Sequence, residues 1–466
     1  MNDFKTKAVR TVGAKLIHYA YKNPQKNVPK LLKFAKRLAG PMFTEATFTA
    51  PIDIVNNKEN TWHDFFYGIM NDIDRDYLES LLLTFAFDCG YIGTKTLRKN
   101  REIYKCNIPW VILMDPTSAC NLKCKGCWAA EYGHKSNLAL DDMRRLIKEA
   151  KELGTHFFMF TGGEPLVKKK EILTLCRENP DCIFLAFTNG TLVDDAFCEE
   201  ILKCKNLSLA LSIEGSEETN DARRGEGVYL KTLKAMETLK KHKCLFGISV
   251  CYTSQNYDAV TSDEFYDKMI ANGVKFAWYF HYMPVGSDAD KGLLLTPEQR
   301  EHVYRQIRKN RKTRNGKPLF TVDFQNDAEF VGGCIAGGRN YFHVNSEGDV
   351  EPCVFIHYSD RNIKTSSVIE VLQSPLFKRY FKGQPFNDNM LQPCPMLENP
   401  TELRKIVAET GAHSTNLLKA ESADELCSKC DEYAENWAPV AKRIWEEQAR
   451  FKPKTQYYRD MVKNDE

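Results

Sequence analysis

The chain has 466 residues, of which 43% are hydrophobic and 11% aromatic, so it can bury a sizeable core in two or three domains. This composition excludes wholesale disorder, collagen-like repeats and a small disulfide scaffold. Lys and Arg number 65 against 62 Asp and Glu, and the net charge of +3 predicts no general attraction to nucleic acid.

Neither a membrane span nor a secretory signal is evident in the sequence. No apolar run approaches the roughly eighteen residues that a spanning helix needs, and the N-terminus lacks the charged-then-apolar order of a signal peptide. We therefore expect a cytoplasmic protein. In such a protein, the sixteen cysteines point to metal binding rather than to disulfides.

Residues 1–104 are predicted to be helical, with a buried helix over Asp72–Phe87. Ten Lys or Arg and no acidic residue lie between Phe4 and Phe43. An acid-free helix with an apolar stripe suits an anionic membrane surface, which gives the hypothesis of peripheral membrane association through residues 1–40. The alternative is that the stripe packs on the barrel while the lysines face water, as charge runs usually do.

From Trp110 onward, strands and helices are predicted to alternate, which defines a core over residues 105–320. Six strand–helix units in series predict an α/β fold with a parallel sheet, whose ligand site lies at the carboxyl ends of the strands. The predicted strands are Trp110–Asp115, His156–Phe160, Ile183–Phe187, Leu207–Ser212, Leu245–Val250 and Phe276–Phe280. The helical patterns between and after them include Leu140–Leu153, Asp194–Lys203, Leu230–Lys241 and Pro297–Lys312.

From Thr321 the alternation is predicted to stop, and residues 321–435 are expected to form a small α+β domain. Tyr341–Val344 and Asp349–Phe355 flank a turn at residues 345–348, which predicts a β-hairpin. Residues 436–466 are expected to form a C-terminal helix, with a helical pattern over Trp437–Tyr458 that Pro453 breaks.

Cys120, Cys124 and Cys127 follow the first predicted strand with the spacing C-x3-C-x2-C. Three thiolates on a short loop can bind three irons of a [4Fe–4S] cluster. Since no fourth cysteine is nearby, one iron stays open to another ligand, which is typical of a catalytic metal site. A zinc site or reduced core thiols are the alternatives.

This spacing, after the first strand of a six-unit β/α series, resembles the radical SAM superfamily. The resemblance implies a partial (β/α)6 barrel in which the open iron binds S-adenosylmethionine through its amino and carboxylate groups. It further implies that the reduced cluster cleaves this cofactor to a 5′-deoxyadenosyl radical, which abstracts hydrogen from a substrate. Cys120, Cys124 and Cys127 would then be the catalytic cysteines.

Motifs at the ends of later strands support this resemblance. Gly162-Gly163-Glu164 follows the second strand and is similar to the family segment that holds the methionine amino group, because glycines admit close approach and a carboxylate accepts from an ammonium. Asn189, after the third strand, is expected either to contact the cofactor or to form an Asn-Gly turn.

After the fourth strand, Ser212 and Glu214 are expected either near the ribose or as caps of the next turn. Arg224 aligns with a family arginine, and its forked donors suit the methionine carboxylate, whereas Arg223 is interpreted as part of a solvated basic turn. The chain departs from the family at Gly126, where an aromatic residue is usual, and this puts in doubt the packing near the adenosyl group.

A second cysteine set begins with Cys334 and Cys353, which flank the predicted hairpin with Gly348 in its turn. This pattern resembles the SPASM extension of radical SAM enzymes. Five candidate thiolates suffice for one auxiliary [4Fe–4S] cluster and not for two. Two of Cys394, Cys427 and Cys430 would complete the site, with the C-x2-C pair favoured, and a four-thiolate zinc site is the alternative. The other cysteines are interpreted as small buried side chains: 89, 106, 176, 182, 198, 204, 244 and 251.

The resemblance covers roughly residues 105–435 and leaves the substrate open. It implies a peptide or protein substrate and an electron donor such as flavodoxin or ferredoxin. The basic N-terminal helices give the further hypothesis of a lipid-like or other membrane-associated substrate. A non-catalytic iron–sulfur electron carrier or a redox-sensing protein is the alternative. Glu164 and Arg224 argue against that alternative, since a carrier has no use for groups that hold an amino acid.

Overall fold

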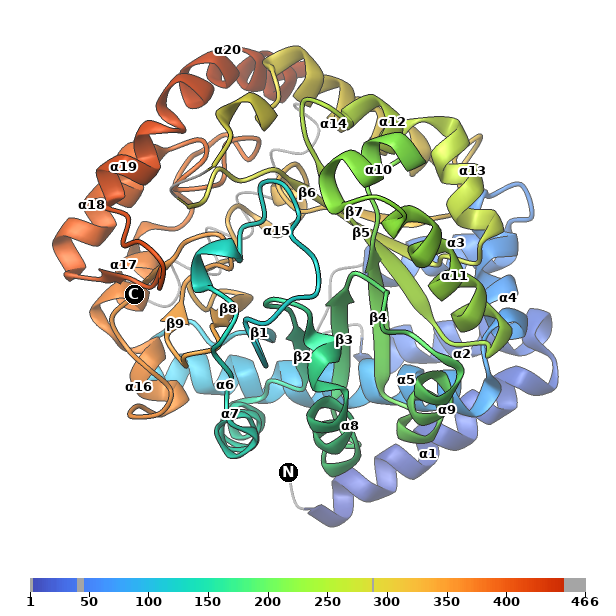
Figure 1. The fold of residues 1–466 in the computed structure, drawn as a ribbon. Helices are drawn as coiled ribbons and strands as arrows, with labels where there is room; N and C mark the ends of the chain where they lie inside the picture. Colours follow the sequence, from blue (N-terminus) through green and yellow to red (C-terminus); the bar gives the residue numbers. More distant parts are fainter. Residues whose placement is uncertain (1–2, 40–45, 287–288, 448–466) are drawn as a thin grey trace.

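The computed structural model describes residues 3–39, 46–286 and 289–447. Its central sheet has the strand order β7-β6-β5-β4-β3-β2-β1-β8-β9, and neighbours from β7 to β8 run parallel. Figure 1 shows these strands curving into a partial barrel with helices outside. The barrel strands are β1 (Val111–Met114), β2 (Phe157–Phe160), β3 (Ile183–Thr188), β4 (Leu207–Ser212), β5 (Phe246–Tyr252), β6 (Phe276–His281) and β7 (Phe320–Asp323).

The strands are continuous apolar runs because both of their faces are covered. All four residues of β1 and all four of β2 are buried, as expected for parallel strands with helices on the outer face. The outer helices are α7 (Leu140–Leu153), α8 (Lys169–Glu178), α9 (Asp195–Cys204), α10 (Glu217–Arg224), α11 (Val228–Lys241), α12 (Tyr257–Thr261), α13 (Asp263–Ala271) and α14 (Pro297–Asn310). The six predicted strands are confirmed within two residues at each end.

β7 is a seventh parallel strand that the sequence did not predict. It pairs with β6, with Phe276 opposite Phe320. A polar loop precedes it, and Thr321 and Asp323 leave no continuous apolar run like those of β1 and β2, so the helix-to-strand alternation was expected to end there.

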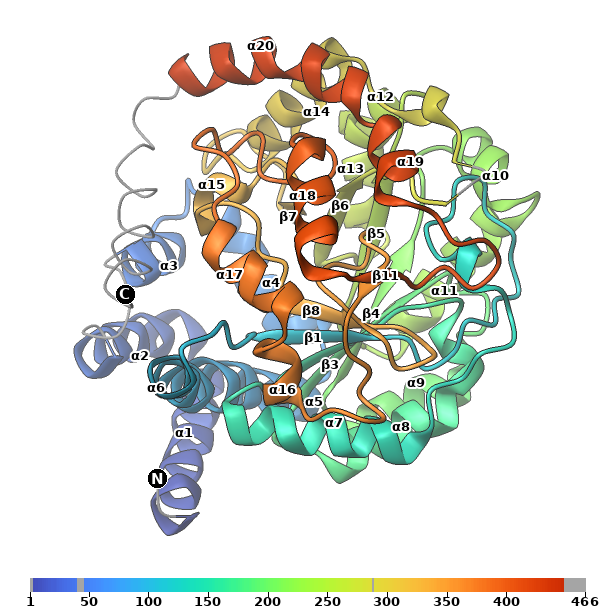
Figure 2. The same ribbon diagram turned by 90° about the vertical axis from the view of Figure 1, so that its left-hand side faces the viewer.

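The N-terminal region is helical, as predicted, and lies at the end of the barrel opposite the loop that follows β1 (Figure 2). Its helices are α1 (Asp3–Lys22), α2 (Pro24–Ala39), α3 (Ala46–Asn56), α4 (Trp62–Asp72), α5 (Arg75–Leu83) and α6 (Thr94–Tyr104). A π-helix, η2 (Thr84–Gly93), joins α5 to α6 where one helix over Asp72–Phe87 was expected. In the described part of the chain, no helix is long and apolar enough to cross a membrane.

The apolar side of α2 packs within the protein. Val28 is buried in a small core with Val55, against which Leu31, Leu32 and Phe66 pack. The lysines of α2 that are described at side-chain level mostly face outward. The apolar stripe therefore packs within the protein, as the alternative expected, but on α3 and α4 rather than on the barrel.

The C-terminal region extends the barrel sheet. β8 (Tyr341–Val344) pairs in parallel with β1, and β9 (Val350–Glu351) pairs antiparallel with β8, which confirms the hairpin. Its other elements are α15 (Ala328–Val331), β10 (Tyr358–Ser359), α16 (Val368–Leu372), α17 (Pro375–Gly383), α18 (Pro400–Thr410), β11 (His413–Ser414), α19 (Ala423–Ser428) and α20 (Asp431–Glu447). The predicted continuation to Tyr458, including the break at Pro453, lies outside the described residues.

Candidate functional site

The three clustered cysteines lie on the loop after β1 and line one cavity at the carboxyl ends of the strands. Cys120, Cys124 and Cys127 are each partly exposed to this cavity. Burial raises the pKa of Cys120 to about 11. Thiols with raised pKa values become ligands when a metal displaces their protons.

The Gly162-Gly163 segment packs directly on this cysteine loop. The amide of Gly163 donates to the carbonyl of Thr117 at 3.0 Å, and the amide of Glu164 donates to that of Ala119 at 2.8 Å. Gly162 has φ +104°, and a Cβ atom there would lie 2.6 Å from the Thr117 oxygen. Both glycines are therefore required for the close approach of two strand-end loops.

Glu164 is buried at the cavity and accepts three hydrogen bonds. Its Oε1 accepts from the Thr188 hydroxyl at 2.6 Å and the Leu166 amide at 2.9 Å, and its Oε2 accepts from the Asn189 amide at 2.8 Å. Burial raises the pKa of Glu164 above its ordinary value, and these bonds oppose that shift. The carboxylate is thus fixed in position, with lone pairs left for a further donor.

The Asn189 side chain combines the two roles considered for it. It lines the cavity, yet its Oδ1 accepts from the Thr191 amide at 3.0 Å in a turn. Its Nδ2 donates to Asn121 of the cysteine loop at 2.8 Å. Asn189 therefore ties the end of β3 to that loop.

Glu214 lies behind the cavity rather than on its lining, and it binds both arginines. Its Oε1 accepts from Arg223 Nη1 at 2.6 Å and from Arg224 Nη2 at 2.5 Å, and Glu214 is fully buried. Arg224 Nη1 points toward Cys124 Sγ at 3.9 Å. Arg223 is only 13% exposed, so its interpretation as part of a solvated turn is wrong. Ser212 lines the cavity at the end of β4.

Tyr282 occupies the space that a side chain at position 126 would need. A Cβ atom on Gly126 would lie 2.7 Å from the Tyr282 ring, and Gly126 has φ +65°. The departure from the family pattern is thus compensated by an aromatic ring from the segment after β6. The neighbouring His281 is buried, and burial lowers its pKa to about 3, so it is a neutral packing residue.

Two buried polar atoms at this site lack a hydrogen-bond partner within the protein, as expected where a ligand binds beside the cysteines. Arg223 Nε and the Tyr282 hydroxyl have no hydrogen-bond partner in the structure, although both side chains line the cavity. Buried polar groups in folded proteins are almost always bonded, so such atoms mark a place for a ligand.

The cysteine spacing does not suit zinc. Zn–S bonds of 2.3 Å in a tetrahedral site place sulfurs about 3.8 Å apart. Among the described residues, His156, Asp181 and Cys182 form the only group of three or more His, Cys, Asp or Glu whose ligand atoms lie within 4.8 Å of one another. Neither cysteine set is that compact, and a larger cluster fits the wider spacing better than one ion.

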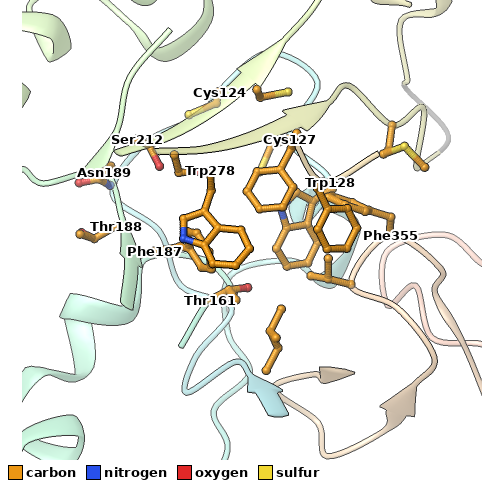
Figure 3. A pocket seen from close by; sticks show the side chains of 18 of the residues that line it. Cys124, Cys127, Trp128, Thr161, Phe187, Thr188, Asn189, Ser212, Trp278 and Phe355 are labelled. Atoms are coloured by element: carbon orange, nitrogen blue, oxygen red, sulfur yellow. The ribbon is translucent and has the colours of Figure 1, made fainter. Parts of the chain in front are cut away.

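The cavity has a volume of about 220 Å³ and continues from the cysteines into an aromatic interior. Figure 3 shows Trp128, Phe187, Trp278 and Phe355 gathered beside Cys127. The sequence analysis missed these rings because strand interiors carry no motif. It also missed Cys251, which lines the cavity near the end of β5. The position of Cys251 near the end of a strand was the sequence signal that could have indicated a place in the cavity.

Four of the five later cysteines interact electrostatically with Tyr380. Burial raises the pKa of Tyr380, and the charges of Cys334, Cys353, Cys394 and Cys427 raise it further. Burial raises the pKa of Cys430, and the charge of Cys427 raises it further. The Tyr380 hydroxyl is buried and has no partner. Tyr341, which lines the cavity, donates to Cys353 Sγ. These residues are suited to hold a buried iron–sulfur cluster behind the cavity wall that Tyr341 forms.

A buried charge network joins β1 to the hairpin. His343 Nε2 lies 2.9 Å from Asp115 Oδ1, and its Nδ1 lies 2.7 Å from Glu351 Oε2. Burial alone would lower the pKa of His343, but Asp115 and Glu351 raise it to about 10. His343 is therefore an imidazolium at neutral pH, held between two carboxylates.

Comparison with known proteins identifies the class. Residues 114–263 match the model of the radical SAM superfamily, and residues 334–396 match that of the SPASM iron–sulfur cluster-binding domain. The chain belongs to the radical SAM superfamily, with a SPASM region at its C-terminal side. It is a radical SAM enzyme that binds S-adenosylmethionine and iron–sulfur clusters.

Individual relatives differ in what their names describe. The chain is 26% identical over 304 residues to the AdoMet-dependent heme synthase of Oleidesulfovibrio alaskensis, covering 58% of this chain and 76% of that protein. It is 28% identical over 214 residues to the serine-type anaerobic sulfatase-maturating enzyme of Klebsiella aerogenes, covering 41% and 51%. Streptococcus suis SuiB bound to its precursor peptide SuiA shares the fold, with TM-score 0.52, 17% identity, and 82% and 90% coverage.

Proposed function

We propose that the enzyme abstracts hydrogen from a peptide, protein or lipid-like substrate placed in the cavity between its two cysteine sets. One observation carries this proposal: Cys120, Cys124, Cys127, Glu164 and Arg224 meet at one end of a cavity whose other wall contacts Cys353 through Tyr341. Such a layout supports a substrate site between two iron–sulfur clusters.

The residues at the strand ends have distinct tasks. The three loop cysteines hold the [4Fe–4S] cluster, which with S-adenosylmethionine supplies a 5′-deoxyadenosyl radical. Glu164 accepts from the amino group of the cofactor, and Arg224 offers Nη1 to its carboxylate. Glu214 orients both arginines from behind, and Ser212 faces the cofactor. Gly162, Gly163 and Asn189 shape the loops around it.

One auxiliary cluster is proposed for the second cysteine set. Cys334, Cys353 and Cys394 affect one another electrostatically, and all three lie in the SPASM match, which favours them as ligands with one of Cys427 and Cys430. This assignment differs from the pairing of Cys427 with Cys430 that their spacing suggests. A flavodoxin or ferredoxin would supply the electron for the first cluster.

The decisive experiment is anaerobic reconstitution with iron and sulfide, reduction with dithionite, and chromatography for 5′-deoxyadenosine. We expect formation of this product and its loss in Cys124→Ala, with folding checked by circular dichroism. Intact clusters without the product would contradict the proposal and favour the electron-carrier alternative.

Peripheral membrane association is proposed on the basis of the exposed Lys26, Lys30 and Lys33 of α2. Each lysine near an anionic surface contributes about 1 kcal/mol. Replacing these three by glutamate should abolish sedimentation with phosphatidylserine liposomes. The matched control replaces three exposed lysines near α11: Lys231, Lys234 and Lys241. Equal sedimentation of both variants and the wild type would contradict the association.

A further inference from the structure

The inner part of the cavity is an aromatic chamber, formed by Trp128, Phe187, Trp278, Phe280, Phe324 and Phe355. These side chains come from β3, β6, the cysteine loop, the residue after β7 and the segment after β9. Residues far apart in the sequence therefore present rings to the same space.

The rings support one another in a continuous series. Phe280 contacts Phe187 at 5.9 Å, Phe324 at 5.3 Å and Phe355 at 6.2 Å between ring centroids. Phe355 in turn contacts Trp128 at 6.3 Å, edge to face. Such contacts hold a wall in one shape. Because well-packed cores leave few voids larger than a water molecule, an open space behind such a wall is suited to a guest.

The charged groups of the cavity lie at its cysteine end and are paired within the protein, except for the Nε of Arg223. Arg223 and Arg224 bind Glu214, and Glu164 accepts from Thr188 and Leu166. Near the aromatic chamber, the Tyr341 hydroxyl already donates its hydrogen bond to Cys353 Sγ. His281, which also lines the cavity, bonds Tyr433 and the Tyr282 carbonyl.

A guest in the aromatic chamber would therefore meet no charged group there, and the only polar atoms of the six rings are the indole N–H donors of Trp128 and Trp278. A carboxylate or phosphate there would lose its hydration without gaining a cation, and a peptide backbone would leave its amides unbonded. A hydrocarbon group gives up no hydrogen bond on entry and is stabilised by the removal of its apolar surface from water.

We propose that the aromatic chamber binds an uncharged hydrocarbon group of the substrate, either an alkyl chain or an apolar amino-acid side chain, while the polar remainder stays outside. This inference rests on the proposed function and names the substrate class of the same site. It disfavours a substrate that presents carboxylates to the chamber.

Calorimetric titration of the reconstituted full chain with 1-octanol, with octanoate as its charged counterpart, tests the inference. We expect saturable binding of octanol with a negative heat-capacity change, and octanoate weaker by about tenfold or more. Phe280→Asp should lose octanol binding, Phe280→Leu should keep it, and Phe320→Asp, on the exposed surface of β7, serves as control. Equal binding by Phe280→Asp and the wild type would overturn the inference.

A second titration identifies the source of the hydrocarbon group. The probe is a short glycine–serine peptide with one leucine, and whichever of peptide and octanol binds more tightly indicates a side chain or an alkyl chain. Binding of neither overturns the inference. Probe binding without 5′-deoxyadenosine formation would contradict the proposed function alone, and cleavage without probe binding would contradict this inference alone.

Discussion

The Tyr341 hydroxyl donates a hydrogen bond of 2.7 Å to the Sγ of Cys353, and the same tyrosine lines the cavity. One side chain thus contacts both the substrate space and a candidate ligand of the auxiliary cluster. Tyr341 is a positioning residue, since it acts on the cluster through the sulfur that it contacts.

Removing this hydroxyl should change the reduction potential of the auxiliary cluster. A hydrogen bond to a ligand sulfur stabilises the reduced, more negative cluster, so Tyr341→Phe should lower the midpoint potential by roughly tens of millivolts. Redox titration followed by electron paramagnetic resonance measures this shift. Tyr279→Phe, which loses a bond to the Val260 carbonyl far from the cysteines, is the control. Equal potentials in Tyr341→Phe and the wild type would contradict this role.

The two cysteine sets should hold separate clusters. Cys124→Ala should lose about four irons per chain and keep the auxiliary cluster, whereas Cys353→Ala should do the reverse. Cys251→Ala, which also removes a thiol from the cavity, should keep both. Iron analysis and Mössbauer spectra after anaerobic reconstitution give the counts. Zinc in place of iron in native protein would refute the assignment.

Glu214→Gln should destabilise the protein by about 3–5 kcal/mol, because it leaves two largely buried arginines without their carboxylate. Glu217→Gln, at an exposed position in the first turn of α10, should change stability little. Urea unfolding under anaerobic conditions measures both. A near-zero effect for Glu214→Gln would show that Arg223 and Arg224 find other partners.

The His343 network should make stability depend on pH. Its pKa is raised to about 10 in the folded chain, against an ordinary value near 6.5, so the folded state binds its proton more tightly. The resulting stabilisation is complete below about pH 6.5 and is lost as the pH rises to 10, by about 1.4 kcal/mol per unit.

Comparing urea unfolding of the wild type and His343→Gln between pH 6 and 10 isolates this contribution, because other titrating groups are common to both. The difference in the free energy of unfolding between the wild type and His343→Gln should shrink steadily as the pH rises to 10. His302→Gln, at a partly exposed site, serves as the matched control substitution. A constant difference for His343→Gln would mean that the histidine is neutral.

The sequence predicted the barrel strands well because buried parallel strands are long apolar runs between helical patterns. It missed β7, because Thr321 and Asp323 interrupt its apolar residues. It could not separate η2 from an α-helix, since the two share composition. Strand-end motifs placed Glu164 and Arg224 at the cavity. The partners of Glu214 and the contact of Tyr341 with Cys353 depend on side chains that meet only in the folded chain, so no local pattern revealed them.

Because β8 hydrogen-bonds to β1 within the nine-stranded sheet, the C-terminal region is not a detachable module. A gene cut after residue 320 would leave β1 as a bare edge, ready to pair with other chains, and would strip Asp115 of its imidazolium. A transplant of either cysteine set into another scaffold must therefore include the β1–β8 pair that joins the two sets.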